Sequence, residues 1–206
     1  MKQTIERELK LEVGPNFRLP KIPGEPLVPR VFVSVYYDTS DHRLARHNVT
    51  LRRRTEKRRH RWQVKLPRGA ARLELELRAP PTEPPDEVRR LLAVYIRGAT
   101  LTPIATLLTR RSGVMVRDLR GPVAEVVLDS VSVFEGRRVA QRFREVEVEL
   151  VGGTEQDLQH IGAMLRAAGA RESDGRPKVF RALGLDFSEE AKPLESPAAA
   201  LDHVLA

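Results

Sequence analysis

The sequence predicts an antiparallel α+β fold in which about eight strands form a barrel or a strongly curved sheet. Alternating polar and apolar residues recur along most of the chain, short turns separate these runs, and only two or three segments have helical periodicity. Many antiparallel strands with few helices are typical of barrels and curved sheets. The first run, I-E-R-E-L-K-L-E-V from Ile5, shows the pattern, with a mostly apolar face and a charged face.

The N-terminal half of the chain contains five of the predicted strands. Each alternates in polarity and most are rich in β-branched or aromatic residues. A proline-rich segment, residues 14–29, follows the first strand and is expected to be irregular. Residues 41–48 predict a short helical turn, and T-E-K-R-R-H from Thr55 predicts a hairpin tip. The five predicted strands are residues 4–13, 31–39, 49–55, 61–67 and 71–79.

The C-terminal half combines helices with three more strands. Apolar spacing predicts a helix that begins near Asp86 and a second, short one over residues 103–108. The clearest helix is 154–169, with Thr154 as its N-cap and Gly169 as its stop signal. The three predicted strands are residues 114–119, 123–133 and 142–151.

The polar segment 188–197 reads as a linker, and the last ten residues begin another helix. The predicted organisation is therefore one domain over residues 1–187, followed by residues 188–206. This tail is either the opening of a further helical domain or a short docking helix.

Composition restricts the function classes. The chain has 206 residues and a net charge of +8, which favours anionic partners such as phosphate compounds. Aromatic residues make up only 5%, which argues against a single-strand nucleic-acid binder that stacks bases. The absence of cysteine excludes disulfides and thiolate sites and fits a reducing compartment. No apolar run has the length of a membrane span, so we expect a cytoplasmic protein with no membrane partner.

The charged faces of the strands contain the most informative pattern. Glu145, Glu147 and Glu149 share one face of a strand, about 7 Å apart, and Arg52 and Arg54 share a face of another. For a single strand, a solvated face explains such charges. Three glutamates in a row repel one another, however, and acidic and basic strands occur in one small sheet. These features favour a sheet whose charged faces point inward, an arrangement that is costly without a function.

A charged interior of this kind would suit a metal-bound polyphosphate. Clustered glutamate oxygens, with no cysteine and no histidines at metal-ligand spacing, favour a hard divalent cation, Mg²⁺ or Mn²⁺. Arginine and lysine side chains favour phosphate oxygens. The cation would neutralise phosphate charge, polarise a phosphoryl group and activate water.

The motifs resemble those of the CYTH domain, or triphosphate tunnel metalloenzyme, family. I-E-R-E-L-K resembles its E-x-E-x-K signature, and further matches follow in the family's order up to about residue 183. These matches are Y-Y-D-T, T-L-R-R-R, V-K-L-P, R-L-E-L-E, T-R-R-S, E-V-V-L-D, E-V-E-L-V and P-K-V-F-R-A-L. Pro177 stands where a serine is common in the family. The resemblance implies an eight-stranded antiparallel barrel, a tunnel with a charged interior and flanking helices.

The resemblance also implies roles for particular residues. The implied metal ligands are Glu6, Glu8, Glu147 and Glu149. The implied catalytic residues are Glu6, Glu8, Lys10, Glu76 and Asp129, although Glu74 is an alternative to Glu76 on the same strand. The implied substrate-binding residues are Lys10, Arg52, Arg54, Lys65, Arg72, Arg111, Lys178 and Arg181. Bacterial family members often continue into a helical CHAD domain linked to polyphosphate, and the C-terminal tail resembles the start of one.

The activity expected from this resemblance is metal-dependent hydrolysis of inorganic triphosphate. No aromatic cage for an adenine or thiamine ring is evident in the sequence. One alternative is a polyphosphate- or nucleotide-binding module without turnover. Another is an adenylyl cyclase or thiamine triphosphatase of the same fold. No specific nucleic acid is expected as a partner, because the basic residues are interleaved with acids and form no single stripe.

Overall fold

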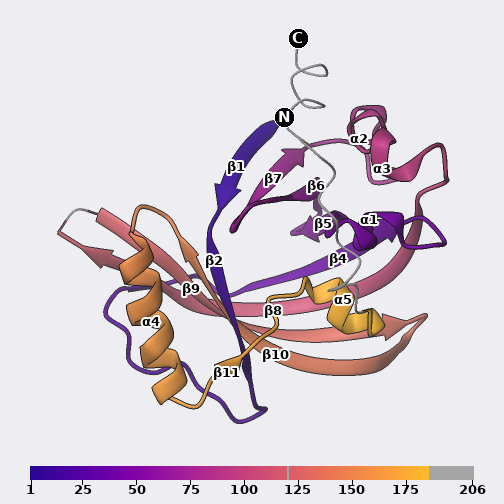
Figure 1. Ribbon diagram of the computed structural model, residues 1–206. Helices are drawn as coiled ribbons and strands as arrows, with labels where there is room; N and C mark the ends of the chain where they lie inside the picture. The colour runs from indigo at the N-terminus through magenta and orange to yellow at the C-terminus, as the bar shows by residue number, and fades with distance from the viewer. Residues whose placement is uncertain (120, 186–206) are drawn as a thin grey trace.

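A computed structural model describes residues 1–119 and 121–185 of the chain. Its strands belong to one antiparallel sheet, ordered β1-β7-β6-β5-β4-β8-β9-β10-β2-β11, with β3 paired to β8 (Figure 1). Their bounds are β1 (Lys2–Glu6), β2 (Glu8–Val13), β3 (Glu25–Pro26), β4 (Arg30–Asp38), β5 (Thr50–Glu56), β6 (Arg59–Arg68), β7 (Ala71–Leu77), β8 (Thr102–Asp118), β9 (Gly121–Glu135), β10 (Arg138–Leu150) and β11 (Arg171–Glu172). The antiparallel fold class is confirmed.

The N-terminal segment joins the two sides of the sheet. The predicted single strand 4–13 is in fact two strands that separate at Arg7: β1 pairs with β7, and β2 pairs with β10. The backbone carbonyl of Arg7 accepts a hydrogen bond from the amide of Leu150 at 2.9 Å. The chain itself therefore bridges two distant parts of the strand order. The sheet is not closed by hydrogen bonds all the way round, so the predicted eight-stranded barrel describes it only approximately.

The predicted helix over residues 103–108 is wrong. These residues belong to β8, which pairs with β4 on one side and with β9 on the other. Apolar residues such as Ile104 and Leu107 occupy both faces of this stretch, which made its period ambiguous. Backbone pairing on both edges decides the conformation, and the predicted strand 114–119 is the end of the same strand.

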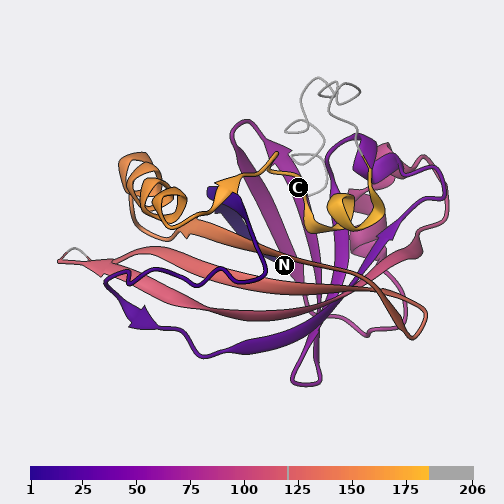
Figure 2. The same ribbon diagram turned by 90° about the horizontal axis from the view of Figure 1, so that it is seen from below.

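Helices cover the apolar faces of the sheet, so its polar faces point inward as predicted. Their bounds are α1 (Arg43–Arg46), α2 (Asp86–Leu91), α3 (Ala93–Ile96), α4 (Glu155–Ala167) and α5 (Lys178–Leu183). Three apolar clusters form beneath them, around Trp62, Leu11 and Phe180. In Figure 1, α4 lies near one end of the long strands and α2 and α3 lie toward the other; Figure 2 shows the same layers from below.

Two local predictions about helix ends and turns are confirmed. Thr154 caps α4 in a capping box with Asp157, and Gly169 follows the helix with φ of 100°. The hairpin tip predicted from Thr55 is a turn between β5 and β6 whose two residues are Lys57 and Arg58.

Asp38 fixes the turn that leads from β4 into α1. Its two carboxylate oxygens accept hydrogen bonds from the backbone amides of Thr39, Leu44 and Ala45 at 2.7, 2.9 and 3.0 Å. Burial raises the pKa of Asp38, against the lowering effect of these amides. The carboxylate therefore takes the place of backbone carbonyls that this short helix cannot supply.

Asp38→Asn should lower the free energy of unfolding by about 1–3 kcal/mol, because an amide nitrogen cannot accept from the buried Ala45 amide. Urea unfolding followed by circular dichroism measures this change. Asp41→Asn is the matched control, since the Asp41 carboxylate is exposed and should matter much less. Equal stability of the Asp38 variant and the wild type would contradict this role.

No helix among the described residues is long and apolar enough to cross a membrane. The predicted linker and tail, residues 188–206, lie outside the described residues.

Candidate functional site

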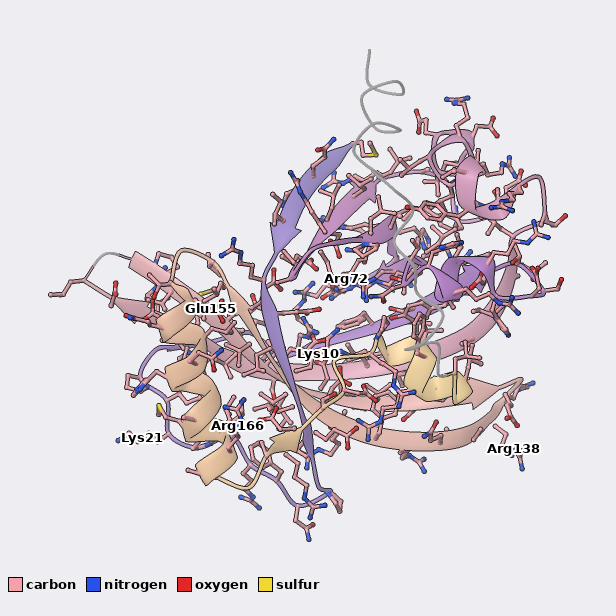
Figure 3. The ribbon with its side chains drawn as sticks, viewed as in Figure 1. Lys10, Lys21, Arg72, Arg138, Glu155 and Arg166 are labelled. Atoms are coloured by element: carbon pink, nitrogen blue, oxygen red, sulfur yellow. The ribbon has the colours of Figure 1, made fainter. Side chains whose placement is uncertain are left out.

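The inward faces of the strands enclose a cavity of about 230 Å³ whose walls are mostly charged. Figure 3 shows the labelled Lys10 and Arg72 in this central region, and Arg138 far from it at the end of the β9–β10 hairpin. The cavity is lined by Lys2, Thr4, Glu6, Glu8, Lys10, Arg30, Phe32, Ser34, Tyr36, Thr50, Arg52, Arg54, Gln63, Lys65, Arg72, Glu74, Leu107, Thr109, Arg111, Glu125, Glu147, Glu149, Pro177 and Lys178.

Strand periodicity explains how these side chains come together. On β4 the even-numbered residues Phe32, Ser34 and Tyr36 face the cavity, whereas Tyr37 packs in the outer apolar cluster. On β6 the same rule places Gln63 inside, while Trp62 is fully buried on the other face. The charged parities of the sequence are therefore the interior of the sheet.

One wall of the cavity is acidic. Glu8 lies opposite Glu149 in the register of β2 and β10, and Glu6 precedes them at the end of β1. Glu6 and Glu8 each contact a lysine, Lys65 and Lys10 respectively. Glu149 has no hydrogen bond or ion pair among the described residues. Burial, and then the neighbouring Glu6, raise the pKa of Glu149 to about 7.

The adjoining wall, on β5, β6 and β7, is mostly cationic and held in place by hydrogen bonds. Arg52 donates to the side-chain oxygen of Gln63 at 2.8 Å and lies 3.7 Å from Glu74. The ammonium of Lys65 lies 3.5 Å from Glu74. Arg72 donates to the backbone carbonyl of Asn48 at 2.7 Å. These contacts fix the arginine and lysine heads in positions where an anion in the cavity can reach them.

A buried ion cluster closes the base of the site. The Lys178 ammonium contacts the carboxylates of Asp129, Glu145 and Glu147, at 3.1 Å for Asp129 and 2.7 Å for Glu147. Arg111 makes two hydrogen bonds to Asp129, at 2.8 and 2.7 Å, and one to Glu147. Nearby carboxylates, despite burial, raise the pKa of Lys178 well above its ordinary value.

Among the described residues, Asp129, Glu145 and Glu147 are the acids whose oxygens converge closely enough for a metal ion, within 4.8 Å of one another. Lys178 already supplies a cation to all three. The acidic group that lacks its own cation is instead Glu149, beside Glu6 and Glu8. The oxygens of these three glutamates are not in the convergent group, but carboxylate oxygens are the donors that a hard divalent cation such as Mg²⁺ or Mn²⁺ prefers, so the chemistry of the donor set fits the metal that the sequence implies.

Most of the predicted site residues line the cavity, and three do not. Asp129 is fully buried behind it, against Arg111. Glu76 lies on the same face of β7 but beyond the cavity, 3.0 Å from Arg61, whereas Glu74 is on the cavity wall. Arg181 lies outside, paired with Glu12 at 3.0 Å. The predicted site residues on the wall are Glu6, Glu8, Lys10, Arg52, Arg54, Lys65, Arg72, Arg111, Glu147, Glu149 and Lys178.

Arg30, Ser34 and Glu125 also line the cavity, although none of them was predicted as a site residue. Ser34 has a buried hydroxyl without a hydrogen-bond partner in the described structure. The alternation of β4 carried a signal for Ser34, since it shares a parity with Phe32 and Tyr36. Glu125 depends on the pairing of β9 with β10, where it lies opposite Glu149. That pairing is not evident from sequence alone.

Comparison with known proteins identifies the family. A sequence model of the CYTH domain matches residues 4–174. The chain belongs to the CYTH family. An uncharacterized protein of Mycobacterium tuberculosis, present in two strains, is 30% identical over 87% of this chain. The chain spans about 40% of the length of these relatives.

Solved structures share the fold of this CYTH chain. A Bacillus halodurans protein, for which adenylate cyclase activity is a hypothesis, has 18% identity and a TM-score of 0.63, over 88% of this chain and 98% of its own. A Hippeastrum protein, a candidate adenylyl cyclase with a dominant triphosphatase activity, has 16% identity and a TM-score of 0.53, over 90% and 98%. At this level of identity the likeness shows the fold.

Proposed function

We propose that this CYTH domain hydrolyses inorganic triphosphate in its charged cavity with a divalent metal, Mg²⁺ or Mn²⁺. The observation that carries the proposal is that one cavity has an acidic wall with an unpaired carboxylate and an adjoining wall of arginine and lysine. A metal-bound polyphosphate needs both kinds of wall. The triphosphatase activity of the Hippeastrum protein of the same fold supports this reading.

Glu6, Glu8 and Glu149 would hold the metal, with Glu147 beside them in the register of β10 and β2. The bound metal would neutralise phosphate oxygens and lower the pKa of a water molecule. The guanidinium groups of the adjoining wall would bind and orient the phosphate chain, because their paired donors match phosphate oxygens. Lys10 lies between Glu8, at 2.9 Å, and Glu147, at 3.9 Å, and would contact phosphate beside the metal.

The aromatic content of the cavity favours an inorganic substrate over a nucleotide. The aromatic residues on the wall are Phe32 and Tyr36. The guanidinium carbon of Arg54 lies 3.5 Å from the centroid of the Phe32 ring, and this stacking covers the ring face. The cavity therefore offers no evident open platform for a base, whereas its cations suit phosphate.

Phosphate release from four substrates tests the proposal. The substrates are tripolyphosphate, ATP, thiamine triphosphate and long-chain polyphosphate, each with Mg²⁺ and with Mn²⁺. We expect release from tripolyphosphate at the highest kcat/KM. Tight binding of tripolyphosphate by calorimetry with no release from any substrate would instead identify a binding module without turnover. Higher turnover of ATP to a cyclic product would identify a cyclase.

The positions of Glu74 and Glu76 predict different effects for the same substitution on one strand. Glu74→Gln should lower kcat/KM for tripolyphosphate about tenfold, because the Glu74 carboxylate orients the facing groups of Lys65 and Arg52. Glu76→Gln should lower it by less than about threefold, because this side chain lies outside the cavity. A larger effect at Glu76 would contradict the assignment from geometry.

The whole protein's partners and location are further proposals. We infer a reducing, cytoplasmic location from the absence of cysteine. The last ten residues, 197–206, which resemble the start of a CHAD domain, lie outside the described structure, and the relatives are longer than this chain. A CHAD domain as C-terminal partner remains a prediction.

A further inference from the structure

A second cavity of about 450 Å³ lies at the turn between β5 and β6, and it is strongly basic. Five basic and two acidic side chains face it, together with one amide, and no aromatic or aliphatic residue does. Its lining is Arg30, Arg54, Glu56, Lys57, Arg59, Arg61, Gln63 and Glu76. We call this volume the hairpin chamber.

The hairpin chamber adjoins the cavity described above. Arg30, Arg54 and Gln63 line both volumes. Arg54 is crowded by other cations: burial, and then Arg52 and Arg30, lower its pKa to about 9. Its nearest acid, Glu56, lies 3.4 Å away and is already bound by Arg30 through two hydrogen bonds. An anion at this junction would relieve the repulsion among these cations.

The turn carries cations where its backbone favours other residues. Lys57 and Arg58 have φ of 47° and 62°, the left-handed conformation, in a two-residue hairpin turn. Asparagine and glycine are the residues that such turns prefer. The side chains of Lys57 and Arg59 also make no hydrogen bond or ion pair within the described part of the chain. Two cations of the chamber are thus available to an external anion.

We propose that the hairpin chamber is a subsite for the continuing part of a linear inorganic polyphosphate whose end is held in the main cavity. This inference rests on the proposed function and extends it to chain length. A phosphate chain presents one anionic unit after another, which matches cations that run from Arg54 to Lys57 and Arg59. The absence of a stacking residue in the lining disfavours a nucleotide tail.

The double variant Lys57→Gln/Arg59→Gln tests the subsite. The measured quantity is the ratio of kcat/KM for long-chain polyphosphate to kcat/KM for tripolyphosphate, with Mg²⁺. We expect this ratio to fall roughly tenfold, since two partly exposed charge contacts are removed. Arg137→Gln/Arg138→Gln is the matched control, because these arginines lie in another exposed turn and line neither cavity. An unchanged ratio, or an equal fall in the control, would overturn the proposal.

Two further measurements separate this proposal from the proposed function. The ratio of kcat/KM for ATP to kcat/KM for tripolyphosphate is measured for the same variants. If this ratio falls in the chamber variant as much as the ratio for long-chain polyphosphate does, the assignment to a phosphate chain is overturned. If the wild type releases phosphate from no substrate, the proposed function fails. Calorimetric binding of long-chain polyphosphate then decides: weaker binding in the chamber variant than in the arginine control supports the subsite, and equal binding overturns it.

Discussion

Glu149→Gln should reduce phosphate release from tripolyphosphate by about a hundredfold or more, because a metal site contributes several kcal/mol to transition-state stabilisation. The same substitution should not destabilise the metal-free protein. Glu149 makes no ion pair among the described residues, and burial and the neighbouring carboxylates outweigh the favourable effect of Lys65 on its charge. A neutral amide removes that repulsion. Steady-state kinetics and thermal unfolding in EDTA measure the two effects.

Glu8→Gln should show the same loss of activity, because Glu8 lies opposite Glu149 on the acidic wall. Glu12→Gln is the matched control: it lies farther along the same strand, where it pairs with Arg181, and it does not line the cavity. Its kcat/KM should stay within about twofold of wild type. Wild-type activity in either cavity variant would refute the assignment of the metal ligands.

Lys178→Met should lower the free energy of unfolding by about 3–5 kcal/mol, the usual cost of removing one partner from a buried ion group. Three carboxylates, those of Asp129, Glu145 and Glu147, would lose their shared ammonium. The control Arg181→Met changes a cation on the same helix that is 29% exposed and paired with Glu12. It should cost about 1 kcal/mol or less. Denaturant unfolding at pH 7 compares the two.

The cost of Lys178→Met should depend on pH. Despite burial, Lys178 and other cations lower the pKa of Glu147. The stability that the Glu147 carboxylate contributes is therefore present above the ordinary glutamate value of 4.5 and is lost as the pH falls. The pKa of Lys178 is raised, so its contribution is complete below 10.5 and is lost only at higher pH. The difference between wild type and variant should therefore be largest near neutrality and shrink in acid. A difference that does not change with pH would contradict the ion cluster.

The alternation of charged and apolar residues was sufficient to predict the interior of the sheet. Glu6, Arg52, Lys65 and Glu149 each lie on the parity that the sequence marked as charged, and each faces the cavity. Successive side chains of a strand point to opposite faces of the sheet. Once the apolar residues are placed against the helices, the charged residues between them must therefore face the interior.

Other features depended on pairing between distant strands. The break at Arg7 follows from the different partners of β1 and β2, and the strand conformation of residues 103–108 follows from neighbours on both edges. The choice between Glu74 and Glu76 could not be made from periodicity, because both share one parity. Their positions along β7 separate them, with Glu74 at the cavity and Glu76 at the hairpin chamber.

The rate of phosphate release from tripolyphosphate as a function of Mg²⁺ or Mn²⁺ concentration tests the central claim most directly. We expect no release in EDTA, saturable activation by the metal in the wild type, and loss of that activation in Glu149→Gln. Release that is independent of the metal, or no release at any metal concentration, would contradict it.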